Sequence, residues 1–299
     1  MAEPRNIWSF HGGLHLDDHK ETSSERPVQR MPLPERLVLP LHQHIGHSAE
    51  AVVTVGDRVK KGQVIARATD YVSAPVHAPT SGQVVEIGDH PIPHPSGLSD
   101  SCIVIAADGE DSWGQMPEPM SDFRARTAAE LRERVRWAGI VGLGGAAFPT
   151  AVKVNTRGEH GIDTLILNAA ECEPYISCDD VLMREQAGDV IDGAAIFRHM
   201  TGARTCLIGI EDNKPEAIAA LRQATTDKGD AATEVVVIPT LYPSGGEKQL
   251  NKPLTGLEVP SQGLPADIGL LCQNVATTVA VADAVLRGRP LIDRIVTLS

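Results

Sequence analysis

The chain has 299 residues, a formal net charge of −12, and ordinary fractions of hydrophobic (42%) and charged (22%) residues. This length suffices for two domains, and this composition excludes a chain that is disordered throughout. The negative charge argues against nucleic-acid binding and against docking on anionic lipid, because both need clustered lysine and arginine. The five cysteines have no C-x-x-C spacing, so we expect a reduced protein without structural zinc or an iron–sulfur motif in these residues.

Residues 1–110 are rich in proline, glycine, histidine and valine, and their short alternating runs are separated by turn residues. Such runs predict an all-β barrel or sandwich. His42, His44 and His47 lie close together in this region. Because their loop offers no cysteine or carboxylate partner, we interpret them as structural histidines, with a metal site as the alternative. Residues 111–122 contain two prolines and several acids and predict an exposed linker.

From residue 123 onward, strand patterns alternate with helix patterns, which predicts a parallel sheet covered by helices. The predicted helices are 128–139, opened by a capping box of Thr127 and Glu130, 178–202, 213–225 with Asn213 as its cap, and 274–288. The predicted strands are 163–168, 205–210 and 233–240.

The first candidate binding motif is a glycine-rich loop that contains Gly142, Gly144 and Gly145, followed by Phe148 and Lys153. Bare main-chain amides, a helix N-terminus and one lysine together predict an anion site. The spacing resembles a dinucleotide fingerprint, but a predicted helix precedes it where the fingerprint requires a strand, and no P-loop lysine follows. The alternative is a tight interhelical turn without a ligand.

The second motif follows the predicted strand 163–168, at the strand end where open α/β sheets bind their ligands. It carries Asn168, Glu171, Cys172 and Glu173. The two carboxylates suit hydroxyl groups or a carboxamide and repel a phosphate. A solvated acidic loop is one alternative, and a divalent cation is another, although the ligand spacing for calcium is absent.

Two further motifs follow later strands. A predicted loop over 239–260 carries Tyr242 and Glu247, and a loop of this length in a compact domain is usually functional. Asn274 is the predicted cap of the last helix, which offers a second helix N-terminus to a phosphate.

Together these motifs resemble the C subunit of the Rnf (Rsx) electron-transport complex and, more distantly, the FMN- and NADH-binding subunit of respiratory complex I. The resemblance covers nearly the whole chain. "HGGLHLDDHK" and "SAPVHAPTSGQV" are similar to the N-terminal β domain of that family, and "GLGGAAFPTAVKV", "NAAECEPYISCDD", "YPSGGEKQL" and "NVAT" are similar to its flavin domain.

The resemblance implies an α/β protein with an N-terminal all-β domain. Residues 1–110 would form a barrel-sandwich hybrid like that of biotinyl and lipoyl carriers, 111–122 a linker, and 123–299 a Rossmann-like parallel-sheet domain for FMN and NADH. A carrier needs a lysine at its hairpin tip. The tip of this chain contains Tyr71 but no lysine, so a carrier-domain enzyme is the least favoured alternative.

The resemblance also implies the binding residues for FMN and NAD(H), and no catalytic side chain, because hydride transfer needs no general base. The implied cofactor-binding residues are Gly142, Gly144, Gly145, Phe148, Lys153, Asn168, Glu171, Cys172, Glu173, Tyr242, Glu247 and, at the FMN phosphate, Asn274. No metal ligands are implied.

In the family, electrons pass between NAD(H), FMN and two [4Fe–4S] clusters of a C-terminal region, toward or from ferredoxin. Membrane and iron–sulfur partner subunits couple this flow to ion translocation. The implied location is peripheral, on the cytoplasmic side of the bacterial inner membrane. The 299 residues stop before the β-grasp and cluster regions of the family, so we expect a piece of a longer chain, or a short paralogue.

Several residues depart from the complex I pattern. Leu143, Ala147, Ala170, Cys172 and Lys248 stand where that subunit has arginine, glycine, aspartate, serine and glutamate. The changes at Leu143, Ala170, Cys172 and Lys248 affect expected nucleotide contacts, so they favour FMN over NADH. The changes at Leu143, Ala147 and Lys248 favour the rival function, a flavin-free adaptor that docks a membrane electron-transport complex.

Overall fold

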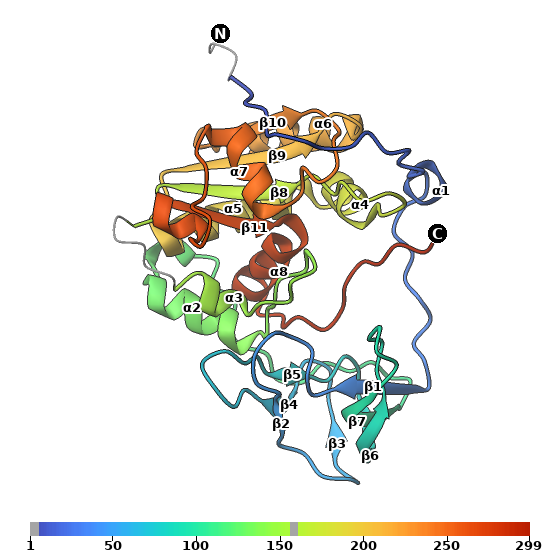
Figure 1. The fold of residues 1–299 in the computed structure, drawn as a ribbon. Helices are drawn as coiled ribbons and strands as arrows, with labels where there is room; N and C mark the ends of the chain where they lie inside the picture. Colours follow the sequence, from blue (N-terminus) through green and yellow to red (C-terminus); the bar gives the residue numbers. More distant parts are fainter. Residues whose placement is uncertain (1–5, 156–160) are drawn as a thin grey trace. The chain divides into compact units, whose positions relative to one another are not determined.

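The computed structural model describes residues 6–155 and 161–299 (Figure 1). The chain forms two compact units, each built from segments that are distant in sequence. The α/β unit consists of Met1–Val28, Val154–Ala282 and Ile295–Ser299, and the β unit consists of Gln29–Lys153 and Asp283–Arg294. The predicted division into 1–110, 111–122 and 123–299 differs from these units at residues 1–28, 123–153 and 283–294.

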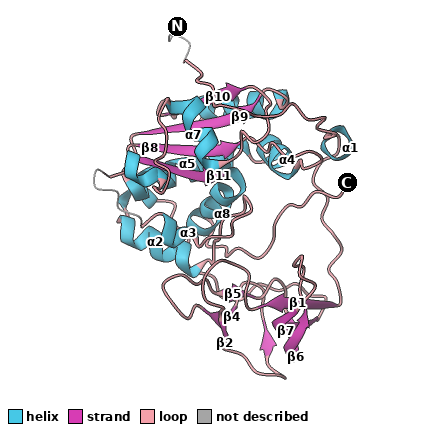
Figure 2. Ribbon diagram, in the orientation of Figure 1, coloured by secondary structure: helices cyan, strands magenta, loops and turns pink. Residues whose placement is uncertain are grey.

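The β unit contains two antiparallel sheets (Figure 2). One has the order β1-β7-β6-β3 and the other the order β2-β4-β5. The strands are β1 Arg36–Pro40, β2 Glu50–Ala51, β3 Arg58–Val59, β4 Val64–Arg67, β5 Val76–His77, β6 Gly82–Pro91 and β7 Ser99–Ala107. The short strands expected in this region are therefore confirmed.

One hydrophobic core joins the two sheets of the β unit. Val59 and Ile103 come from the first sheet and Ile65 and Val76 from the second, and all four belong to the same buried cluster. Gly82 allows β6 to approach β7, because a Cβ there would lie 2.1 Å from the carbonyl oxygen of Ala106. The two sheets thus pack as a sandwich.

Of the three neighbouring histidines, His44 bonds the main chain around its loop, whereas His42 and His47 lie near carboxylates. The ring of His44 is buried, with Nε2 accepting from the Ala74 N–H at 3.0 Å and Nδ1 donating to the Ile45 carbonyl at 3.1 Å. His47 lies 3.4 Å from a carboxylate oxygen of Asp70. Both ring nitrogens of His44 bond main-chain groups, which agrees with a structural role.

The segment predicted as a linker lies along the β unit. The main-chain N–H of Lys61 donates to the Ser112 carbonyl, and the main-chain carbonyl of Lys61 accepts from the Gly114 N–H, both at 2.9 Å. Its ammonium lies 5.1 Å from the ring centre of Trp113. Further along, the 3₁₀ helix η1 (Phe123–Ala125) leads into α2 (Ala128–Trp137) and α3 (Thr150–Lys153).

The α/β unit is built on a parallel sheet with the order β10-β9-β8-β11. Its strands are β8 Thr164–Ala169, β9 Thr205–Glu211, β10 Thr233–Ile238 and β11 Leu270–Asn274. Its helices are α1 Glu21–Ser24, α4 Cys178–Glu185, α5 Ala187–Thr201, α6 Pro215–Asp227, α7 Glu247–Thr255, the 3₁₀ helix η2 Pro265–Ile268, and α8 Val275–Leu286, whose last turn lies in the β unit. The predicted parallel sheet with helices is confirmed.

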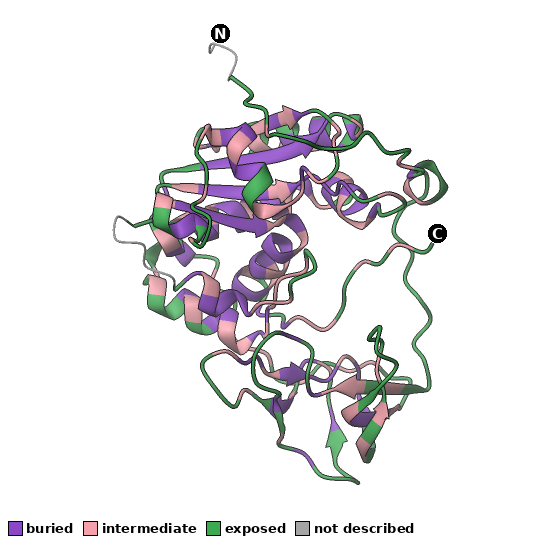
Figure 3. Ribbon diagram, viewed as in Figure 1, coloured by how far each residue is buried: buried purple, intermediate pink, exposed green. Residues whose placement is uncertain are grey.

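Both faces of this sheet are covered, as Figure 3 shows by its buried strands. Leu250 and Leu254 of α7 pack on the face that carries Ile166. Gly209 lies under them, since a Cβ there would be 2.9 Å from both leucines. Leu165 points to the opposite face by the alternation of a strand and is also fully buried.

Four sequence-based element predictions are corrected. The helix expected over 178–202 is interrupted at Gln186, whose φ of −128° is not helical, and forms α4 and α5. Strand β11 was not expected, because its residues are buried on both faces and show no alternation. Helix α7 occupies part of the expected loop 239–260; two preceding glycines and the internal Pro253 obscure its pattern. Asn213 does not cap α6, whose N-cap position is Lys214.

Among residues 6–155 and 161–299, none of the helices combines the length and the apolar composition that a membrane span requires.

The buried imidazole of His77 predicts a pH-dependent stability of the β unit. His77 packs edge-on against Trp137, with ring centres 5.2 Å apart, and neither ring nitrogen has a hydrogen-bond partner among the described residues. Burial lowers the pKa of His77 from 6.5 to about 4. Between these values the unfolded chain binds more protons than the folded one, so stability is complete above pH 6.5 and falls as the pH drops toward 4.

We expect the change to reach about 3 kcal/mol across this range, and we expect His77→Phe to remove it while keeping the ring contact. Denaturant titrations from pH 4 to 7, followed by tryptophan fluorescence, measure it. Equal pH slopes for the wild type and His77→Phe would contradict the assignment.

Candidate functional site

The carboxyl ends of four parallel strands define one edge of the α/β unit. β8, β9 and β10 follow one another outward across the sheet, whereas β11 lies on the other side of β8. The strand order therefore reverses between β8 and β11. Open α/β sheets bind ligands outside the carboxyl ends of their strands at such a reversal. Asn168 and Asn274 lie at the carboxyl ends of β8 and β11, and the loop after β8 carries Glu171, Cys172 and Glu173.

The peptide groups of Gly245 join the loops after β8 and β10. Asn168 donates its side-chain amide to the Gly245 carbonyl at 2.7 Å, and its own Oδ1 accepts from the Ala170 N–H at 3.2 Å. The Gly245 N–H donates to Cys172 Sγ at 3.3 Å. A Cβ on Gly245 would lie 3.0 Å from that sulfur. Asn168 and Cys172 thus hold the second loop against the first.

The carboxylate of Glu171 is turned into the protein. It accepts from the N–H groups of Asp179 at 2.7 Å and Asp180 at 3.2 Å, which places it at the N-terminus of α4. Cys178 Sγ lies 3.4 Å from it. Burial, with the charge of Asp179 adding, raises the pKa of Glu171 to about 7, against the opposing effects of the helix amide and Lys20.

Of the two acids in this loop, only Glu173 is exposed. The carboxylate of Glu171 bonds the protein's own helix in this structure, and its role as a cofactor ligand stays a prediction. Glu171 also has a positive φ of 49°, a backbone conformation that is uncommon for residues other than glycine.

Asn274 caps α8, as predicted. Its Oδ1 accepts from the N–H groups of Ala276 at 2.9 Å and Thr277 at 3.2 Å. Its amide donates to Asp179 Oδ2 at 2.6 Å. The end of β11 is thereby joined to the start of α4 at the strand-order reversal.

Tyr242 and Glu247 come from the segment after β10. Tyr242 is 37% exposed, pairs through its main chain with Leu14, and precedes Pro243 by a cis peptide bond. Glu247 is partly buried in the first turn of α7. Its neighbour Lys248 donates to the main-chain carbonyls of Pro260 and Ser261, at 3.2 and 3.3 Å.

The glycine-rich loop lies in the β unit, between α2 and α3. It closes on itself, because the Gly142 N–H donates to the Phe148 carbonyl at 2.9 Å and the Thr150 N–H donates to the Ile140 carbonyl at 2.9 Å. Lys153 is the last residue of α3, which is a single turn. The expected anion site at a helix N-terminus is therefore not supported here, since the amides of Gly142 and Thr150 are already bonded.

The turn at Gly144 and Gly145 remains as the part of this loop that can receive a ligand. Both residues are exposed. Gly145 has a φ of +110°, and no atom lies within 4 Å of an ideal Cβ there. The space beside its backbone is open, so a flat group can approach the main chain closely.

Sequence reasoning missed a set of buried charges near these loops. Lys20 is buried, and the pair Glu211–Lys214, with 3.2 Å between Nζ and Oε2, is almost fully buried. Ser244 donates to Glu211 Oε1 at 2.6 Å. Lys20 stands in the motif "HGGLHLDDHK", but neither spacing nor charge pattern indicated that it is buried.

These features define a class: a β sandwich in the same chain as an open α/β unit of the kind that binds flavins or nucleotides at its carboxyl edge. Two family models match in agreement with this class. Residues 8–110 match the "RnfC Barrel sandwich hybrid domain", and residues 135–283 match the "Nuo51 FMN-binding domain".

Close relatives cover almost the whole chain. They are C subunits of an "Ion-translocating oxidoreductase complex", and their identity to this chain is 55% in Pseudomonas aeruginosa, 50% in Vibrio cholerae and 51% in Serratia proteamaculans, each over 98% of this chain. The chain belongs to the family of these C subunits. It spans 37% of the length of the first two relatives and 41% of the third.

A solved structure shares part of the fold. An NAD⁺-reducing [NiFe]-hydrogenase in the H2-reduced state is similar over 56% of this chain and 33% of its own, with 26% identity and a TM-score of 0.50.

The contact between Gly245 and Cys172 makes a testable prediction. Gly245→Ala places a methyl group against Cys172 Sγ, and we expect the free energy of unfolding to fall by about 1–3 kcal/mol, as in other overpacked interiors. In a Cys172→Ala background the sulfur is gone. The loss of stability caused by Gly245→Ala should then be smaller than in the wild-type background, by at least about 1 kcal/mol. Denaturant titration of the four proteins measures this; equal losses in both backgrounds would contradict the packing described.

Proposed function

We propose that this chain is the FMN- and NAD(H)-binding part of an electron-entry subunit of a membrane redox complex. One observation carries the proposal most directly. The residues that match the Nuo51 FMN-binding domain, 135–283, include all twelve residues that the sequence indicates as cofactor-binding. The relatives' name, an ion-translocating oxidoreductase complex, supports a redox role for the whole protein.

The described residues fit FMN within each unit. In the β unit, the exposed turn at Gly144 and Gly145 leaves open space beside its backbone, which suits a flat ring. In the α/β unit, the loop after β8 supplies an exposed carboxylate at Glu173, and the loop after β10 supplies an exposed phenol at Tyr242. Donors and acceptors of these kinds recognise phosphate and hydroxyl groups.

Bound FMN supplies the capacity to take a hydride and to release electrons one at a time. The chain's own residues bind and orient. Asn168 and Cys172 keep the loops after β8 and β10 together. Glu173 accepts hydrogen bonds from hydroxyl or carboxamide groups, and Tyr242 and Glu247 contribute from the loop after β10. Glu171 acts indirectly, because it holds the N-terminus of α4.

The rest of the proposal follows the family. Hydride is exchanged between NAD(H) and FMN, and electrons pass to or from two [4Fe–4S] clusters and ferredoxin through regions and subunits outside these residues. Partner membrane subunits perform the ion translocation. The proposed location is peripheral, on the cytoplasmic side of the bacterial inner membrane.

A flavin-free adaptor is the second candidate function. Two observations favour it: the Gly142 amide is bonded to Phe148, and the Glu171 carboxylate is bonded to α4. Both groups are therefore withdrawn from ligand binding. An adaptor would dock other subunits through its β unit and would bind neither FMN nor NADH.

Titration with FMN separates the two candidates. The redox proposal predicts saturable binding, measured by quenching of flavin fluorescence, and subsequent bleaching of the flavin's visible absorbance by NADH without air. A folded protein that takes up no FMN supports the adaptor.

Gly145 tests the role of the glycine turn. We expect Gly145→Val to weaken FMN binding by about tenfold or more, because its side chain enters the open space beside the turn. Gly56→Val is the matched control in the same unit, since Gly56 also has a high positive φ (+101°) and no neighbour within 4 Å of a Cβ. Equal FMN affinity of both variants would remove the glycine turn from the site.

Glu173 tests the recognition of the nicotinamide nucleotide. We expect Glu173→Gln to weaken NADH binding by about tenfold, because a hydrogen bond to a charged acceptor is replaced by a neutral one, while FMN binding is unchanged. Glu216→Gln, at another exposed acid of the α/β unit, is the control. Wild-type NADH affinity in Glu173→Gln would exclude Glu173 as a ligand.

A further inference from the structure

The first residues of the chain do not lie with the β strands that follow them in sequence. Residues 7–28, here called the N-terminal strap, belong to the α/β unit, along which they run in dark blue in Figure 1. Leu14 and Tyr242 exchange main-chain hydrogen bonds of 2.7 and 2.9 Å, and the Tyr175 N–H donates to the Asp18 carbonyl at 2.7 Å. The strap therefore contacts both loops that carry predicted cofactor residues after β8 and β10.

The strap is also fixed at both of its ends. The Trp8 N–H donates to the Pro253 carbonyl at 3.2 Å, and the indole lies so close to Gly256 that a Cβ there would be 2.9 Å from the ring. Near the other end, the Arg184 guanidinium donates to the Ser24 carbonyl at 2.6 Å.

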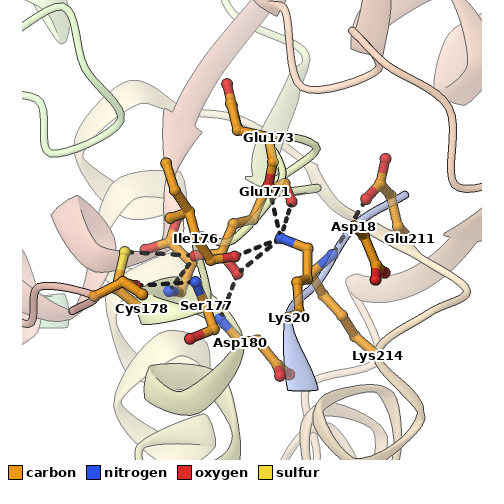
Figure 4. A network of polar contacts seen from close by, with 12 residues as sticks. Asp18, Lys20, Glu171, Glu173, Ile176, Ser177, Cys178, Asp180, Glu211 and Lys214 are labelled. Carbon is orange, nitrogen blue, oxygen red and sulfur yellow. Dashed lines mark hydrogen bonds and ion pairs between the residues drawn. The ribbon is translucent and has the colours of Figure 1, made fainter. Parts of the chain in front are cut away.

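Lys20 lies within the strap, and its side chain points into the loop after β8 (Figure 4). The residue is 7% exposed. Its ammonium donates to the main-chain carbonyls of Glu171 at 2.8 Å, Glu173 at 3.1 Å and Ile176. An ammonium has three N–H donors, so three carbonyls of one short loop use all of them. A single side chain thereby fixes the direction of three peptide groups.

Glu171 supplies the carboxylate that is paired with the charge of Lys20. Its Nζ lies 3.9 Å from the nearer carboxylate oxygen of Glu171. Burial lowers the pKa of Lys20, and Glu171 opposes this effect. Since a buried ammonium without partners is strongly unfavourable, the arrangement is stable only while the three carbonyls keep their orientation.

A chain of polar contacts extends from the strap toward the loop after β10. Asn213 donates to Asp18 Oδ2 at 2.9 Å, and Lys214 donates to Asn213 Oδ1 at 2.8 Å. Lys214 pairs with Glu211, which accepts from the Ser244 hydroxyl. Asn213, expected to cap a helix, has this role instead.

We propose that the N-terminal strap is a built part of the cofactor-binding unit, and that Lys20 is a positioning residue that sets the main chain of residues 171–176 and so the direction of Glu173. This inference rests on the proposed function, because it gives Lys20 a role at the same site. The strap therefore belongs to the α/β unit, although the match to the barrel-sandwich hybrid domain begins at residue 8 and includes it.

Hydrogen exchange of the cofactor-free protein tests the structural half of the proposal. Lys20→Met keeps the length of the side chain and removes its donors. We expect amides of residues 172–177 to exchange about tenfold faster or more, with the amides of β8, β9 and β10 unchanged. Lys228→Met, which removes an exposed ion pair with Asp192 in the same unit, should leave the loop unchanged. Wild-type exchange of the loop in Lys20→Met overturns the proposal.

A double-mutant cycle on NADH binding tests the positioning half. Lys20→Met and Glu173→Gln should each weaken NADH binding by about tenfold. The NADH affinity of the double variant should be about equal to that of the weaker-binding single variant. Such non-additivity is expected only if Lys20 acts through Glu173. Losses that multiply would show that Lys20 affects the fold generally and would overturn its positioning role.

The two arms separate this inference from the proposed function. If the wild type binds neither FMN nor NADH, the proposed function and the positioning role fail together, and the exchange experiment still decides whether Lys20 orders the loop. If Lys20→Met does not fold, Lys20→Gln replaces it: a neutral amide has only two N–H donors for the three carbonyls, so the same amides should exchange at least about threefold faster, and unchanged exchange would overturn the proposal.

Discussion

Hydrogen bonds between side chains and main-chain groups hold the carboxyl edge of the parallel sheet together. Asn168 and Cys172 bond the carbonyl and the N–H of Gly245, and Asn274 caps α8 while it bonds Asp179. Loops lack the repeating bonds of helices and sheets, so a few such contacts decide their conformation. Glu173, which we propose as a ligand of the nicotinamide nucleotide, lies in a loop held in this way.

At two positions, close packing leaves no room for a side chain larger than that of glycine. Gly245 has room for hydrogen only beside Cys172, and Gly209 lies directly under two leucines of α7. In both places the glycine is required by close packing, whereas Gly145 has a positive φ and open space beside its backbone. The same residue type thus marks internal packing in one loop and an open surface in another.

The sequence predicted those parts of the fold whose signal is local. The capping box of Thr127 and Glu130 forms with both of its hydrogen bonds, and the regular alternation of strands and helices predicted the parallel sheet. Strand β11 and helix α7 escaped prediction because burial on both faces removes alternation from one, and Pro253 interrupts the pattern of the other.

The sequence places several of the predicted site residues at the ends of strands, but it does not predict how their side chains are oriented. Glu171 and Glu173 are equivalent in sequence, yet one is buried at the start of α4 and the other is exposed. Their difference depends partly on Lys20, which is 151 positions away from Glu171, and such a distant contact leaves no periodic or spacing signal. The strap likewise precedes the β strands in sequence and packs with the other unit.

The central claim is the proposal that this chain binds FMN through the residues that its sequence indicates. Hydrogen exchange of the wild-type chain, measured with and without saturating FMN, tests it most directly. The account predicts slower exchange with FMN in residues 143–147, 168–177 and 242–247 and at the start of α8, with the β strands of the sandwich unchanged. Protection confined to other regions, or no protection anywhere, would contradict it.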